Sequence, residues 1–206
     1  MIPTSESIGI DVSRETLDRL KLYQELLHKW TRKINLVSPT TVQTSWERHF
    51  VDSAQVFELA ELETGKWLDL GSGGGFPGMV CAAIAAEKAP TLGFYLVESD
   101  VRKVAFLRTV SRELGLDVKV SNKRIEDLDP ASSDIVTARA LASLKDLLQL
   151  SKPHGKPKCR YLFMKGANWK EEVENAQKSW RFSLACHKSK THSEAVILEI
   201  GDITNV

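Results

Sequence analysis

Four closely spaced glycines are the first residues in this sequence whose pattern indicates chemistry. Gly71, Gly73, Gly74 and Gly75 follow the short apolar run 67–70 and precede an alanine-rich run of good helix formers. Glycine accepts positive φ freely and has no Cβ to hold a ligand away. A strand, a glycine turn and a helix bring backbone N–H groups and a helix N-terminus against a cofactor. The segment therefore predicts a nucleotide-type cofactor site.

Two classes of cofactor use such a turn, and a preceding acidic residue helps to separate them. Gly73, Gly75 and Gly78 have the dinucleotide spacing G-x-G-x-x-G, so a nicotinamide-dependent oxidoreductase is one alternative. Asp69 stands two positions before Gly71, and a carboxylate there would repel a pyrophosphate. It would instead favour a ligand with an ammonium or sulfonium group, and S-adenosylmethionine carries both.

Two further acids and an apolar residue follow the next predicted strands. Glu98 ends the strand predicted over 91–97, where it can accept hydrogen bonds from both ribose hydroxyls. Ile125 can supply an apolar face to adenine, and Glu126 follows it in the loop after the third strand. Either acid alone would more often be an exposed surface residue. Together, at the carboxyl ends of successive strands, they indicate an adenosine site.

The elements that must position these residues alternate between strand and helix from residue 67 onward. This alternation is typical of a doubly wound α/β fold. Residues 180–186 and 195–200 predict an antiparallel hairpin at the sheet edge. Residues 13–30 predict an amphipathic helix with Ser13 as its N-cap. We expect one compact domain, 63–206, preceded by a helical extension, 1–62, packed on it.

The bulk properties narrow the class of protein. The chain has 206 residues and a formal net charge of +1, so composition alone does not indicate a nucleic-acid partner. Its three cysteines are far apart and show no C-x-x-C spacing, which argues against a zinc site or a disulfide framework. We see no signal peptide and no apolar run long enough to span a membrane. We expect a cytoplasmic protein with no metal and no membrane partner.

Short segments from about residue 20 to residue 166 carry a family resemblance. They are Asn35-Leu36, Arg48-His49-x-x-Asp52-Ser53, Asp69-x-Gly71-x-Gly73-x-Gly75-Phe76-Pro77-Gly78, Glu98-Ser99, Lys103-x-x-Phe106-Leu107, Arg124-Ile125-Glu126, Thr137-Ala138-Arg139-Ala140 and Lys165-Gly166. In this order and spacing they resemble the small-subunit ribosomal RNA guanine-N7 methyltransferase family, RsmG or GidB. Beyond Gly166 the match thins, because Ser193-Glu194 and Glu199 stand where the family often has basic residues.

The resemblance implies a class I S-adenosylmethionine-dependent methyltransferase fold, Rossmann-like, with a mostly parallel seven-stranded sheet and an antiparallel edge hairpin. By matching position it implies cofactor contacts from Gly71, Gly73, Phe76, Glu98, Ile125, Glu126 and Arg139. It also implies a target, N7 of guanine 527 in the 530 loop of 16S rRNA, offered as RNA or as the small ribosomal subunit. We expect a monomer. A ribosome-binding protein that has kept the fold and lost catalysis is the other alternative.

Guanine N7 has an in-plane lone pair and no proton, so its methylation requires no general base. The sequence offers no convincing nucleophile–base pair, and we assign no catalytic acid or base. The expected mechanism is a direct displacement that depends on orientation. Basic or polar residues must then hold the RNA, and the candidates are Arg48, His49, Arg124 and Lys165.

Overall fold

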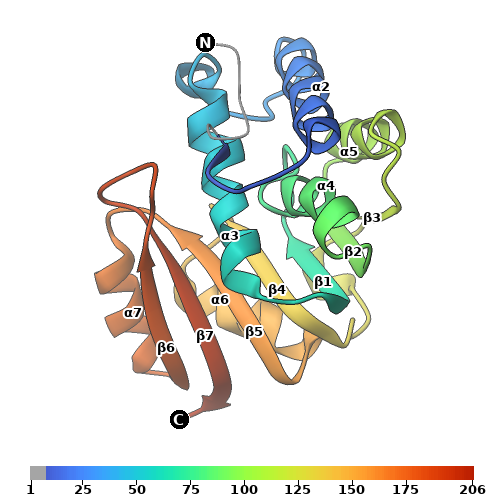
Figure 1. The fold of residues 1–206 in the computed structure, drawn as a ribbon. Helices are drawn as coiled ribbons and strands as arrows, with labels where there is room; N and C mark the ends of the chain where they lie inside the picture. The colour runs from blue at the N-terminus through green and yellow to red at the C-terminus, as the bar shows by residue number, and fades with distance from the viewer. Residues whose placement is uncertain (1–7) are drawn as a thin grey trace.

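The computed structural model describes residues 8–206, which form one seven-stranded sheet flanked by helices (Figure 1). The strand order is β3-β2-β1-β4-β5-β7-β6. The strands are β1 (Thr64–Leu70), β2 (Thr91–Glu98), β3 (Val118–Asn122), β4 (Ser133–Arg139), β5 (Gly155–Lys165), β6 (Trp180–Lys188) and β7 (Val196–Asn205). The helices are α2 (Arg14–Thr31), α3 (Asp52–Ala60), α4 (Gly78–Lys88), α5 (Val101–Glu113), α6 (Leu144–Ser151) and α7 (Trp169–Gln177).

Strands β1 to β5 run parallel, whereas β7 pairs antiparallel with both β5 and β6. The predicted mostly parallel sheet with an antiparallel edge hairpin is therefore confirmed. The chain moves outward from β1 to β2 and β3, then returns to place β4 on the other side of β1. Such a reversal opens a crevice beyond the carboxyl ends of the two central strands, which is where open α/β sheets bind ligands. Gly71 and Arg139 stand at those two ends.

The sheet buries a different apolar cluster on each face. In β1, Trp67 belongs to the cluster shared with α2 to α5, whereas Leu68 and Leu70 belong to the cluster shared with α6 and α7. This division follows from the strand geometry, because successive side chains point to opposite faces. Both faces of the central strands are covered, which explains why apolar residues such as Trp67 and Leu68 stand next to each other in β1.

The residues before β1 cover one face near the crevice. Helix α2 begins at the predicted N-cap, where Ser13 Oγ accepts a hydrogen bond from the backbone of Thr16. A π-helix, Trp46–Val51, follows in the same extension and continues directly into α3. Residues 1–7 of the predicted extension lie outside the described residues. The division of the chain at residue 62 stays a prediction.

Candidate cofactor and active site

Two constraints require glycine in the turn after β1: positive backbone φ angles and neighbouring side chains that leave no room for a Cβ. Gly73 has φ +54° and lines a cavity, and a Cβ there would meet only the carbonyl oxygen of Gly71 at 3.8 Å. Gly75 has φ +89°, and a Cβ there would clash with the hydroxyl of Tyr23 and with Met79. Glycine is thus required at 75 by packing and at 73 by the left-handed φ.

Glu98 joins the ends of β1 and β2. Its Oε2 accepts a hydrogen bond from the backbone N of Gly73 at 2.9 Å, and its Oε1 accepts one from Asp100 N at 2.8 Å. The side chain lines the cavity although the residue is only 7% exposed. Each carboxylate oxygen has further acceptor capacity, so Glu98 is held in place with lone pairs left for a ligand hydroxyl.

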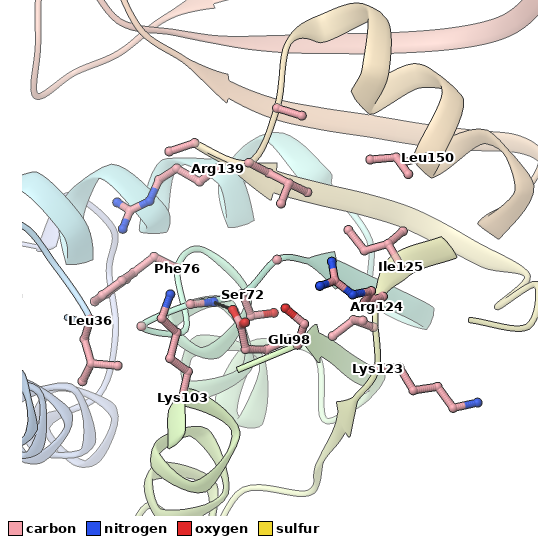
Figure 2. Close-up of a pocket in the computed structure, with 18 of the residues that line it drawn as sticks. Leu36, Ser72, Phe76, Glu98, Lys103, Lys123, Arg124, Ile125, Arg139 and Leu150 are labelled. Atoms are coloured by element: carbon pink, nitrogen blue, oxygen red, sulfur yellow. Dashed lines mark hydrogen bonds between the residues drawn. The ribbon is translucent and has the colours of Figure 1, made fainter. Parts of the chain in front are cut away.

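A cavity of about 550 Å³ lies over these strand ends. Figure 2 shows Glu98 and Ile125 facing one hollow, with Arg139 and Phe76 on its other side. All seven residues predicted to contact the cofactor line it: Gly71, Gly73, Phe76, Glu98, Ile125, Glu126 and Arg139. A fixed carboxylate, apolar side chains and a glycine turn without Cβ atoms fit a nucleoside cofactor. The individual contacts stay predictions.

The interpretation of Asp69 needs correction. Asp69 is fully buried and does not line the cavity. It shares the face of β1 that carries Trp67, because residues two apart in a strand point the same way. There its Oδ1 accepts a hydrogen bond from Thr137 at 2.7 Å, and its carboxyl lies against Gly78 at the start of α4. Burial raises the pKa of Asp69 to about 6. The residue supports the glycine turn from beneath instead of facing the ligand.

Arg139 and His49 form a pair at the far side of the cavity. Nη1 of Arg139 lies 2.9 Å from Nδ1 of His49, and its guanidinium lies 4.7 Å from the ring centroid of Phe76. An arginine can only donate, so Nδ1 of His49 accepts and Nε2 carries the proton. Nε2 then donates to Thr41 Oγ1 at 3.0 Å, whose own proton goes to the carbonyl of Ser38.

Burial and neighbouring positive charges keep the imidazole of His49 neutral. Burial lowers its pKa to about 3, and the positive charges of Arg139 and Arg48 add to the effect. Both ring nitrogens are engaged, and the ring stacks on Phe76 with centroids 5.0 Å apart. The ring therefore orients Arg139 and has no free nitrogen to act as a base.

A second cavity of about 300 Å³ adjoins the first. Arg139, Ala140 and Ala142 line both. Three of the four residues predicted to hold RNA, Arg48, His49 and Lys165, line the second cavity, whereas the exposed Arg124 lines the first. Figure 2 shows the guanidinium of Arg124 turned toward Glu98. The structure thus brings the RNA candidates to two connected cavities, and their contacts with RNA stay predictions.

Lys165 is already engaged within the protein. Its Nζ lies 2.7 Å from Glu172 Oε2 and donates to the carbonyl of Ala142 at 2.6 Å. Glu172 Oε2 also accepts from the backbone of Leu144 at 2.7 Å. The residue is 8% exposed. This geometry favours a role in joining β5, α6 and α7 over a contact with an RNA phosphate.

Sequence reasoning missed two contributors to the site. Tyr23 donates from its hydroxyl to the carbonyl of Gly74 and stacks on Phe76, so α2 holds the cofactor turn. The predicted amphipathic helix 13–30 implied one buried face, but no local signal linked Tyr23 to residue 74. The π-helix that carries Arg48 and His49 was also missed. Single π-turns are frequent at functional sites, but their hydrophobic pattern is too close to that of an α-helix to be recognised.

The described residues, 8–206, contain no cluster of three or more His, Cys, Asp or Glu side chains suited to a metal ion. Over the same residues, no helix combines the length and apolar character needed to cross a bilayer.

The chain is similar to known methyltransferases in sequence and in fold. Residues 16–200 match the family described as GidB, rRNA small subunit methyltransferase G. The protein of that name from Ruegeria pomeroyi is 48% identical over 206 residues, covering 100% of both chains. Its counterpart from Brucella canis is 44% identical over 194 residues, covering 93% of this chain and 90% of the relative.

Solved structures agree on the fold. A SAM-dependent methyltransferase from Aquifex aeolicus superposes with a TM-score of 0.58 at 16% identity, covering 84% of this chain and 96% of the other. TYW2 from M. jannaschii, solved in complex with AdoMet, superposes with a TM-score of 0.53 at 10% identity. The match covers 75% of this chain and 77% of TYW2. At these identities the likeness concerns the fold alone.

Proposed function

We propose that this chain, which belongs to the GidB family of rRNA small subunit methyltransferases G, methylates N7 of guanine 527 in the 530 loop of 16S rRNA. Its family makes it an rRNA methyltransferase, and its fold is the one that S-adenosylmethionine-dependent methyltransferases share. The nicotinamide alternative is set aside on the same grounds. We further propose that it acts as a monomer in the cytoplasm, on RNA or on the small ribosomal subunit.

One observation supports the proposal most strongly: two connected cavities share Arg139 at the carboxyl ends of β1 and β4. We assign the larger cavity, with Glu98 and Ile125, to the cofactor. We assign the smaller cavity, with Arg48 and His49, to the acceptor base. Arg139 would then stand where the two reactants meet.

The assigned residues suit a reaction that depends on orientation. S-adenosylmethionine supplies an electrophilic methyl group when bound. Guanine N7 needs no deprotonation, and His49, neutral with both nitrogens engaged, offers no base. His49 and Phe76 fix Arg139, whose remaining N–H groups can hydrogen-bond the acceptor base or a neighbouring phosphate. Fixing the reactants in a productive geometry supplies much of the acceleration in such a step.

The test is methyl transfer from labelled S-adenosylmethionine to small subunits that lack the modification, followed by mapping of N7-methylguanosine. We expect one labelled guanine, in the 530 loop. A label elsewhere would overturn the proposed target, and no transfer would support the non-catalytic alternative.

Calorimetry tests the cofactor cavity separately. We expect S-adenosylhomocysteine to bind and NAD not to bind. Gly73→Val should abolish binding because it places a branched side chain in the cavity at a left-handed φ. Gly93→Ala is the matched control, since its Cβ would meet only an ordinary contact at 3.6 Å.

A further inference from the structure

One carboxylate of α3 holds the loop between β6 and β7. Oδ1 of Asp52 accepts hydrogen bonds from Gln55 Nε2 at 2.8 Å, from Ser189 Oγ at 2.9 Å and from Thr191 Oγ1 at 2.9 Å. The buried Gln55 also accepts from the backbone of Lys190 at 3.0 Å. The contacts of Asp52 and Gln55 with the loop join segments more than 130 positions apart in sequence.

The loop does not need this anchor to complete its turn. Within the hairpin, Ser189 N donates to the carbonyl of Ala195, and Ala195 N donates to that of His192. Ser189 Oγ also accepts a hydrogen bond from Thr191 N at 3.1 Å inside the loop, and both Ser189 and Thr191 donate their hydroxyl protons to Asp52. The anchor sets where the loop lies relative to α3.

The position of the loop matters because it forms one side of the smaller cavity. Ser189 and Ala195 line that cavity together with Arg48, His49 and Asp52. In Figure 1 the loop lies near the carboxyl ends of β4 and β5, on the side of the sheet that α3 covers. The other walls come from the strand ends and from α7.

We propose that Asp52 is a positioning residue for the acceptor RNA, which holds the 189–195 loop as a wall of the cavity that receives the methyl-accepting guanine. This inference rests on the proposed function, because it takes the smaller cavity as the acceptor site. A loop fixed before the RNA arrives loses less conformational freedom on binding. Release of the loop should therefore weaken RNA binding and raise the KM for RNA. It should leave cofactor affinity unchanged, since none of the loop residues lines the cofactor cavity.

The experiment must separate the anchor from the charge of Asp52, because that charge also acts on Arg139. Asp52→Asn removes the charge and disturbs the anchor. The double variant Ser189→Ala/Thr191→Val removes two donors from the loop and keeps the carboxylate. Ser193→Ala is the matched control, since Ser193 lies exposed in the same loop and its side chain hydrogen-bonds its neighbour Glu194 at 3.5 Å.

We measure the KM for unmodified small subunits, direct binding of the same subunits, and calorimetric affinity for S-adenosylhomocysteine. Both anchor variants should raise the RNA KM and weaken RNA binding at least fivefold, with cofactor affinity within twofold of wild type. Ser193→Ala should match wild type. If only Asp52→Asn has an effect, Asp52 acts through Arg139 and the proposal is wrong. An equal loss of cofactor affinity would make the anchor a general fold contact and would also overturn it. A wild-type protein that binds subunits but transfers no methyl group would refute the proposed function, and the binding assay would still test the loop.

Discussion

The hydrogen bond from Arg139 to Nδ1 of His49 joins the end of β4 to the π-helix across 90 positions of the chain. This bond connects the motif segment that contains His49 to the one that contains Arg139, at residues that line the smaller cavity, and Arg139 lines the larger cavity as well. The neutral histidine serves as an acceptor that aims the arginine, and Phe76 supports both from beneath.

Arg139→Ala should lower kcat for methyl transfer about 100-fold, because a small loss of alignment is enough for that effect. Stability should fall by only about 1–3 kcal/mol, since Nδ1 of His49 loses its partner. Arg160→Ala is the matched control: Arg160 bonds Glu199 and the carbonyls of Leu59 and Ala60, away from both assigned cavities. It should reduce thermal stability without changing kcat per folded molecule. Parallel losses of kcat and stability in Arg139→Ala would make that residue structural.

Tyr23→Phe should weaken S-adenosylhomocysteine binding about three- to tenfold. The variant keeps the stacking on Phe76 but removes the hydrogen bond to Gly74 O, and such a bond contributes about 1 kcal/mol. Calorimetry checks the affinity, and Tyr95→Phe, on the partly exposed side of β2, is the control. Unchanged affinity would show that the glycine turn keeps its shape without α2.

Asp69→Asn should become more stable relative to wild type as pH rises through about 6. The folded state raises the pKa of Asp69 from 3.8 to about 6, so the native protein holds a proton that the unfolded chain has lost in this window. The contribution of the acid to the free energy of unfolding is therefore complete below pH 4 and is lost as pH rises through about 6. For a shift of this size the loss is about 3 kcal/mol. Denaturant unfolding of both proteins at pH 4 and pH 7.5 measures the difference. A constant difference would mean that Asp69 does not titrate in this range.

Arg124→Gln and Lys165→Gln should have different effects. Arg124 is exposed at the cofactor cavity, so its loss should raise the RNA KM and reduce the salt dependence of RNA binding by about one unit of log–log slope. Lys165 is buried and paired with Glu172, so its loss should mainly lower the melting temperature, because the partly buried carboxylate of Glu172 loses its partner. Thermal melts and RNA titrations at several salt concentrations compare the two. If Lys165→Gln instead changed the salt slope at constant stability, Lys165 would be an RNA contact.

The alternation of strands and helices after β1 and the closing hairpin of β6 and β7 could be predicted because both rest on local patterns. Apolar runs, glycine punctuation and helical spacing act over a few residues. The place of Glu98 and Ile125 beside the glycine turn was predictable for a related reason, since parallel strands bring their carboxyl ends to one edge. The sequence by itself thus determined the fold class and the edge of the sheet where the cofactor cavity lies.

Tertiary packing alone decided how the side chains at that edge are used. Asp69 was expected to face the ligand. Its side chain instead points to the same face of β1 as Trp67, where it lies buried against the start of α4. Tyr23 meets Gly74, Arg139 meets His49, and Asp52 meets Ser189, across 51, 90 and 137 positions. A hydroxyl, guanidinium or carboxylate has many possible partners in the chain, and only the packing of the elements selects one. Local sequence encodes the donors and acceptors, and the fold determines which of them pair.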